Sequence, residues 1–235
     1  MPLVDHLLVL TFVALWPLLA LRGYRKFLRD VKADVPGVRA RMYLRTIAEQ
    51  WILTLAVLGW WLHEQRDLHE LGLRLGSTGP AIAGALLTGG VLVLFLQQWK
   101  KIRGLDTQRL AKLEASLGDA APLLPTSASE LRLFRVLSVT AGICEEILFR
   151  GYLLWYLAAG VGTWPAMLLG AALFGVAHSY QGVKGTLKTG IGGLVLVALY
   201  QTTGSLLWPM MLHAAMDLQG GAIGSLLHRR RAATS

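Results

Sequence analysis

Long apolar stretches separated by basic connections are the feature that most constrains this chain. Each stretch approaches the roughly 20 residues that a helix needs to cross a bilayer. Hydrophobic residues make up 54% of the 235 residues and charged residues only 16%, against about 25% charged in soluble domains. We therefore expect an all-α, polytopic membrane protein with about seven transmembrane helices, between six and eight. The predicted spans fall near residues 3–21, 43–62, 80–98, 134–157, 164–180, 186–203 and 205–227.

The basic residues indicate how these spans are oriented. They crowd the connections at 22–45 and 99–112 and the end of the chain at Arg229–Arg231. Loops rich in Lys and Arg stay in the cytoplasm, which predicts an outside N-terminus and a cytoplasmic C-terminus. Because the net charge of +9 is spread over these connections, it argues against nucleic-acid binding. A composition rich in Ala, Leu, Gly and Arg favours a bacterial source, and hence the bacterial inner (plasma) membrane.

The first apolar run resembles a signal peptide, but we expect it to be retained. It carries Asp5 and His6 in place of a basic leading region, and it lacks a cleavage site of small residues. We divide the chain into N-terminal transmembrane helices at 1–130, a C-terminal helix bundle at 131–228 and a basic cytoplasmic tail at 229–235.

One sizeable polar stretch, 104–130, closes the N-terminal part. Leucines recur at helical spacing within it, which predicts an amphipathic helix on the cytoplasmic face; a solvated linker is the alternative. Pro122 and Pro125 are expected to end that helix. The leucines are Leu105, Leu110, Leu113 and Leu117.

Ionisable residues inside three of the last four apolar runs point to a functional site. A charge at the centre of a bilayer costs about 2.5–3.5 kcal/mol, so such residues are rare and usually paired. A single intramembrane histidine or a Glu–Arg pair can be purely structural, but the first three spans hold almost no comparable central charge. The residues are Glu145, Glu146 and Arg150 in the fourth span, His178 in the fifth, and His213 and Asp217 in the seventh.

Helical spacing separates these residues by role. Glu146 and Arg150 are four apart, the favoured order for an ion pair. Glu145 lies about 100° around the helix from Glu146 and is therefore the less neutralised carboxylate. His213 and Asp217 can likewise face one site, and Phe174, four residues before His178, can form its wall.

A carboxylate beside a histidine in a dry site can deprotonate a water for attack on a carbonyl. Neighbouring donors can then hold the oxyanion that forms. Cys144 is the only cysteine, and a buried cysteine is usually an inert packing residue. Water is therefore the expected nucleophile. The residue types alone would suit a proton relay in a transporter almost as well.

The ordered motifs decide between these readings by resemblance. Glu145-Glu146-x-x-x-Arg150, Phe174-x-x-x-His178 and His213-x-x-x-Asp217 resemble, in order and spacing, those of the CAAX-protease and bacteriocin-processing family. This family is also called Abi, or type II CAAX prenyl endopeptidase-like. The resemblance covers roughly 134–220, while the first 130 residues share only a general membrane character.

The resemblance implies a multi-helix endopeptidase of the glutamic type. Glu145 with His178 would activate the water, while His213 and Asp217 would support the oxyanion. Glu146 and Arg150 would hold the geometry. Asp217 is a departure, because the eukaryotic branch has Asn there, and an ionised Asp cannot donate to an oxyanion. It could instead orient His213.

The charges of the candidate site residues are compatible with either a metal-free site or a divalent metal. With neutral histidines the three acids and Arg150 sum to −2, which two protonated histidines or one divalent metal would balance. Zinc on Glu145, His178 and His213 is the second choice. No zinc-protease motif such as H-E-x-x-H is present and the resemblance leans metal-free, so we expect no cofactor.

The sequence thus predicts an intramembrane endopeptidase that cleaves a membrane-proximal bond in a membrane protein or peptide. Two alternatives stay open: a non-proteolytic immunity or scaffold protein, and a proton-coupled transporter. Transporters commonly show internal repeats, and none is visible here. With a bacterial source, a peptide or a C-terminal sorting signal is a more reasonable substrate than a prenylated protein.

Overall fold

The computed structural model describes residues 1–232, and these residues form helices without any strand. The last three residues of the predicted tail, 233–235, lie outside the described part. In chain order the helices are α1 (Leu3–Leu10), η1 (Thr11–Leu15), α2 (Trp16–Lys32), α3 (Val38–His63), α4 (Thr78–Arg103), α5 (Thr107–Leu117), η2 (Gly118–Leu123), α6 (Ala128–Glu146), η3 (Ile147–Leu153), α7 (Leu154–Val161), α8 (Thr163–Ala177), η4 (Ser179–Gln181), α9 (Gly182–Thr203) and α10 (Leu207–Ala232).

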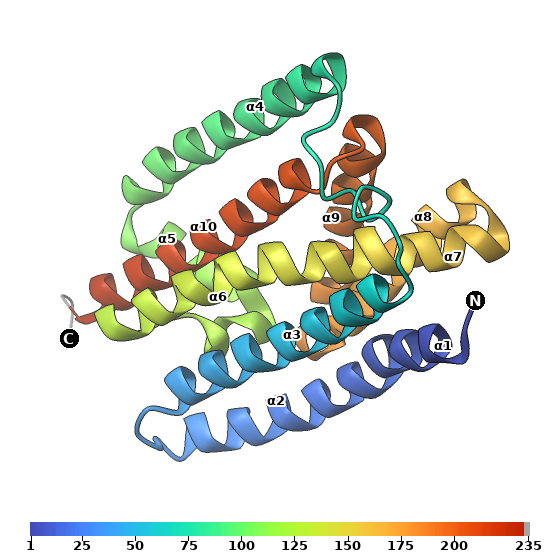
Figure 1. The fold of residues 1–235 in the computed structure, drawn as a ribbon. Helices are drawn as coiled ribbons and strands as arrows, with labels where there is room; N and C mark the ends of the chain where they lie inside the picture. The colour runs from blue at the N-terminus through green and yellow to red at the C-terminus, as the bar shows by residue number, and fades with distance from the viewer. Residues whose placement is uncertain (233–235) are drawn as a thin grey trace.

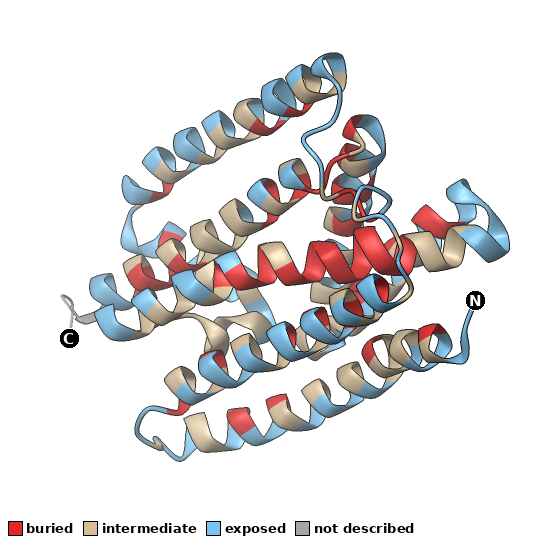
Figure 2. Cartoon of the chain, viewed as in Figure 1, coloured by how far each residue is buried: buried red, intermediate tan, exposed pale blue. Residues whose placement is uncertain are grey.

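The long helices lie side by side in a bundle. In Figure 1, α2, α3, α6, α10 and α4 follow one another in this order, with α8 and α9 behind them. The central member is the continuous helix α6–η3–α7, whose residues 144–154 are all buried (Figure 2). Its middle part, η3, is a π turn, a local widening of the helix that is found frequently at functional sites.

Every predicted span falls largely on helix. Most helices extend beyond the predicted ends, but α8 ends at Ala177, before residue 180, and α10 begins at Leu207, after residue 205. Three helical runs within residues 1–232 are long and apolar enough to cross a membrane: Leu3–Lys32, Thr78–Arg103 and Ser179–Thr203. Thr163–Ala177 is a shorter apolar helix. α6 and α10 carry the charged residues singled out above, which lower their hydropathy. The all-helical membrane class is confirmed, while the count of seven stays a prediction.

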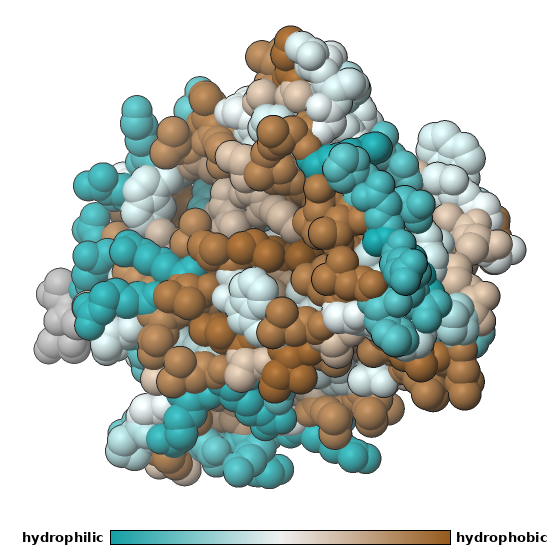
Figure 3. All heavy atoms as spheres, in the orientation of Figure 1, coloured by the Kyte–Doolittle hydropathy of each residue, from teal (hydrophilic) through white to brown (hydrophobic). Residues whose placement is uncertain are grey.

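The basic connections gather at one end of the bundle. The α2–α3 turn, the α4–α5 turn and the C-terminal end of α10 lie together, opposite the N-terminus and the 64–77 loop (Figure 1). Arg230 bonds the carbonyl of Arg103, and Arg231 forms an ion pair with Glu114 on α5. On the face seen in Figure 3, hydrophobic side chains cover the middle and hydrophilic ones lie towards its left and right. The bundle therefore has one basic end and an apolar waist.

The polar stretch before α6 does contain a helix, α5. Asp106 caps it by accepting a hydrogen bond from the backbone of Arg109. Its leucines, with Leu110 at their centre, pack against Ile102 and Leu227 rather than standing free as a linker would. The helix ends at Gly118, whose φ is +52°, four residues before Pro122, so the prediction that the prolines end it is wrong. Glycine adopts this φ readily, so the helix stops there.

A buried acid pins the first helix to the bundle. Asp5 is fully buried and accepts hydrogen bonds from Arg66, Trp60 and Tyr152. Arg66 lies in the 64–77 loop and donates to both carboxylate oxygens; these bonds raise the pKa of its guanidinium. Tyr152 belongs to η3, so the first helix is tied directly to the central one.

Candidate active site

Two adjacent carboxylates end α6 at the point where the π turn begins. Glu145 and Glu146 are its last two residues, and η3 starts at Ile147. Their exposed fractions are 6% and 0%, although both are acids. Buried charges persist only where they are paired or hydrogen-bonded, so the partners of each carboxylate define its role.

Glu146 is bonded through Oε1 to two basic side chains, while its buried Oε2 has no hydrogen-bond partner within residues 1–232. Its Oε1 lies 2.9 Å from an Arg150 nitrogen and 2.7 Å from Nδ1 of His213. Arg150 also donates to the Gly193 carbonyl on α9 at 3.2 Å, and its guanidinium lies 4.1 Å from the centre of the Phe174 ring. The expected Glu146–Arg150 ion pair is therefore present, and it anchors α9 and α8 to the central helix.

His213 is oriented by Glu146. A carboxylate only accepts, so Nδ1 donates and Nε2 is left facing Glu145, 3.9 Å from its Oε2. The sequence suggested that Asp217 could orient His213 instead. Its side chain lines the same cavity but forms no hydrogen bond or ion pair within residues 1–232. Glu146 has this role because α6 and α10 pack closely.

His178 lies just beyond the end of α8 and is held by the backbone. Its Nδ1 is 2.9 Å from the Phe174 carbonyl, which can only accept, so Nδ1 carries a proton. Nε2 then faces Glu145 Oε2 at 3.7 Å. The Phe174 ring lies between the two histidines, with its centre 4.7 Å from the His178 ring and 5.9 Å from the His213 ring. It forms the expected wall.

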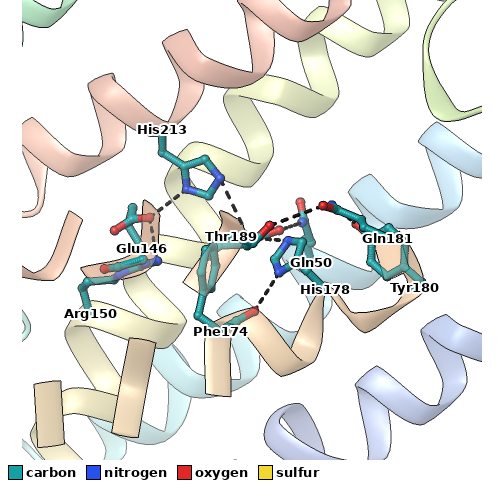
Figure 4. A network of polar contacts seen from close by, with 11 residues as sticks. Gln50, Glu146, Arg150, Phe174, His178, Tyr180, Gln181, Thr189 and His213 are labelled. Carbon is teal, nitrogen blue, oxygen red and sulfur yellow. Dashed lines mark hydrogen bonds and ion pairs between the residues drawn. The ribbon is translucent and has the colours of Figure 1, made fainter. Parts of the chain in front are cut away.

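Glu145 is the point on which these groups converge. Its Oε1 accepts a hydrogen bond from Gln50 of α3 at 2.7 Å. Its Oε2 is buried and has no hydrogen-bond partner within the described chain, and Nε2 of both histidines lies nearby. In Figure 4, Glu146 and Arg150 lie to the left of His213, and Gln50 and His178 lie to its right.

A cavity of about 460 Å³ opens from this centre. Its polar end is lined by Glu145, His178, His213 and Asp217, whereas Glu146 and Arg150 lie outside the lining. Most of the remaining lining residues are apolar and come from several helices, α2, α3, α6, α8, α9 and α10 among them, but Arg45, Glu49 and Lys188 also line the cavity. The cavity therefore joins a polar site to a space suited to apolar side chains.

The donor set resembles that of a catalytic zinc site, two histidines and one glutamate. Zinc–ligand distances of about 2.0–2.1 Å in tetrahedral geometry imply separations of about 3.3 Å between ligand atoms. The two Nε2–Oε2 separations are 3.7 and 3.9 Å. No group of three or more His, Cys, Asp or Glu in residues 1–232 has the arrangement of a metal site. The choice between a metal-free site and zinc stays a prediction.

Gln50 was missed by the sequence analysis, which looked for charges inside the spans. It is a polar residue between Trp51 and Glu49 in the 43–62 span, and an uncharged amide gave no signal in that search. A search for every polar side chain inside the predicted spans would have found it. Gln181, which links the Tyr180 hydroxyl and Thr189 along the cavity, lies one residue beyond the predicted 164–180 span and was also missed.

Comparison with protein families supports the resemblance that the motifs suggested. Residues 127–219 match the family described as type II CAAX prenyl endopeptidase Rce1-like. This segment of the chain is therefore similar to that family. The Rce1-like segment contains all seven residues of the three motifs but not Gln50. Comparisons with curated proteins and with solved structures gave no match.

Proposed function

We propose that this protein is an intramembrane endopeptidase that hydrolyses a membrane-proximal peptide bond with a water activated by Glu145 and His178. The observation that carries the proposal is the buried Oε2 of Glu145, which lies near Nε2 of two histidines and has no hydrogen-bond partner within residues 1–232. A buried polar atom of this kind calls for a ligand. A water there can donate one proton to Oε2 and the other to Nε2 of neutral His178, leaving its lone pairs for the substrate.

The reaction follows from these positions. Glu145 takes a proton as the water oxygen bonds to the substrate carbonyl carbon, and the carbonyl becomes an oxyanion. His213 in its charged form can donate Nε2–H to that oxyanion, since Nδ1 is held by Glu146, whose negative charge favours the imidazolium. The C–N bond then breaks, and the departing amine takes the proton from Glu145. Asp217 lines the cavity and would border the substrate there.

The family and the cavity support a substrate with an apolar segment at the membrane. The family description names CAAX prenyl endopeptidases, and the cavity beyond the polar end is mainly apolar. For a bacterial protein we favour a peptide or a C-terminal sorting signal over a prenylated protein.

The test compares cells that carry the wild type, Glu145→Gln or His178→Ala. Mass spectrometry of protein termini in the membrane fraction should show termini that depend on the wild type and disappear in both variants. Glu70→Gln and His69→Ala, which change the same residue types in the exposed 64–77 loop, should keep them. If both site variants fold, insert and yield the wild-type termini, the protease proposal is wrong and an immunity or scaffold role takes its place.

A further inference from the structure

Gln50 is a buried amide that reaches the active site from outside the Rce1-like segment. It lies on α3, and only 2% of its surface is exposed. α3 packs along α6 (Figure 1), which brings Gln50 opposite the end of α6. It lines the same cavity as Glu145 and His178. The N-terminal part of the chain therefore contributes a side chain to the site.

The contact between Gln50 and Glu145 has a defined direction. The carboxylate can only accept, so the amide must present Nε2 to Oε1, where the distance is 2.7 Å. Hydrogen bonds to a charged acceptor are stronger than neutral ones. Since Oε1 is held in this way, Oε2 is the oxygen directed at His178 and His213. Oε1 is therefore fixed by Gln50, and Oε2 is the oxygen available to bind the water.

Packing alone does not account for an amide at this position. Oε1 of Gln50 is buried and has no hydrogen-bond partner within residues 1–232. A methionine would fill a similar space without burying an unpartnered acceptor. The contact that accounts for an amide here is the one made by its Nε2, which holds Glu145.

We propose that Gln50 is a positioning residue for the catalytic carboxylate: it holds Oε1 of Glu145 so that Oε2 faces the two histidines. This proposal rests on the proposed function, because it assigns Glu145 the role of general base. It adds to the site a residue that the family segment does not include.

The test uses purified full-length protein in detergent and a fluorescence-quenched peptide that spans a cleavage site found by the terminus analysis above. Gln50→Met keeps the size but removes the donor, so kcat should fall about 10- to 100-fold while KM stays within about twofold, the pattern of a lost transition-state interaction. Gln50→Glu keeps the shape but places a second carboxylate against Glu145, so its kcat should fall at least as far as that of Gln50→Met. Gln98→Met makes the same change on α4, where Gln98 contacts Gln219 away from the site, and should match the wild type.

Three results separate the outcomes. A wild-type kcat in folded Gln50→Met, or a raised KM with unchanged kcat, overturns the positioning role. If Gln50→Met does not fold, kcat of the nearly isosteric Gln50→Glu is measured instead. A wild-type kcat in that variant overturns the positioning role. If the wild type cleaves nothing, the proposed function fails by itself. The contact is then tested by infrared difference spectra against Glu145→Gln: the Glu145 carboxylate band should shift in Gln50→Met and stay in place in Gln98→Met, and an unshifted band overturns the inference.

Discussion

At the scale of single residues, the buried pair of Glu146 and Arg150 sets the stability of the site. Arg150 is 2% exposed and is the only arginine bonded to Glu146 in residues 1–232. Removing one partner of a buried ion pair destabilises a protein by about 3–5 kcal/mol, because it leaves an unpaired charge, whereas removing both can be nearly neutral. A variant that lacks one partner of this pair should therefore be less stable than a variant that lacks both.

We expect Arg150→Met to lower the free energy of unfolding by about 3–5 kcal/mol. The double variant Glu146→Gln/Arg150→Met should recover part of this loss, because the carboxylate that Arg150→Met leaves with only His213 as a partner becomes a neutral amide. Unfolding in mixed micelles, followed by tryptophan fluorescence, gives both values. Arg74→Met, at an exposed arginine that bonds the Gly204 carbonyl, is the control and should change little. A double variant no more stable than Arg150→Met would contradict this account of the pair.

The distances between Glu145, His178 and His213 bear on whether the site holds a metal. Because the Nε2–Oε2 separations exceed those of ligands on one zinc ion, we expect peptide cleavage to survive dialysis against EDTA and 1,10-phenanthroline. The measurement is the cleavage rate before and after dialysis, with elemental analysis of the purified protein. Loss of cleavage that zinc restores would establish the second choice, a metal held by Glu145, His178 and His213.

At the scale of elements, a glycine controls how closely α6 and α10 approach. A Cβ on Gly142 would lie 2.8 Å from the Ala214 side chain and 2.9 Å from the Met210 carbonyl, closer than such atoms normally come. Small residues of this kind let membrane helices pack tightly. The contact lies one residue along α10 from His213, so the same approach brings His213 to Glu146.

Gly142→Ala should therefore separate the two helices near the site. We expect a loss of about 1–3 kcal/mol from overpacking and a cleavage rate reduced at least tenfold, since His213 moves away from Glu146. Gly90→Ala on α4, where a Cβ meets nothing within 4 Å, should keep the rate and stabilise its helix by up to about 1 kcal/mol. Equal activity in the two variants would show that the approach of α6 to α10 does not set the site.

The same contacts explain how far the sequence could predict the site. The Glu146–Arg150 pair follows from spacing within one helix, and the apolar runs place each span to within several residues. The bond between His213 and Glu146 depends on the packing of α6 against α10, which no local pattern encodes. Gln50 reaches Glu145 across 95 positions of sequence and carries no charge to attract notice. The π turn that follows Glu146 likewise has no simple sequence signal.

At the scale of the whole molecule, contacts between distant segments join the N-terminal helices to the Rce1-like bundle. Asp5 holds Tyr152 of η3, and Gln50 holds Glu145 at the end of α6. Both contacts come from residues before 127, outside the segment that matches the family. The proposed site therefore takes in side chains from helices outside the matched segment.

The gathering of basic residues at one end of the bundle predicts how the molecule sits in the membrane. If that end faces the cytoplasm, single cysteines introduced in a Cys144→Ala background should react differently with a membrane-impermeant maleimide. Ser77→Cys, exposed at the opposite end, should be labelled on intact spheroplasts, whereas Ser116→Cys on α5 should be labelled only after lysis. Labelling of both residues in lysed membranes controls for reactivity. The reverse pattern would turn the molecule over and place α5 and η2, which contribute to the cavity lining, on the outer side.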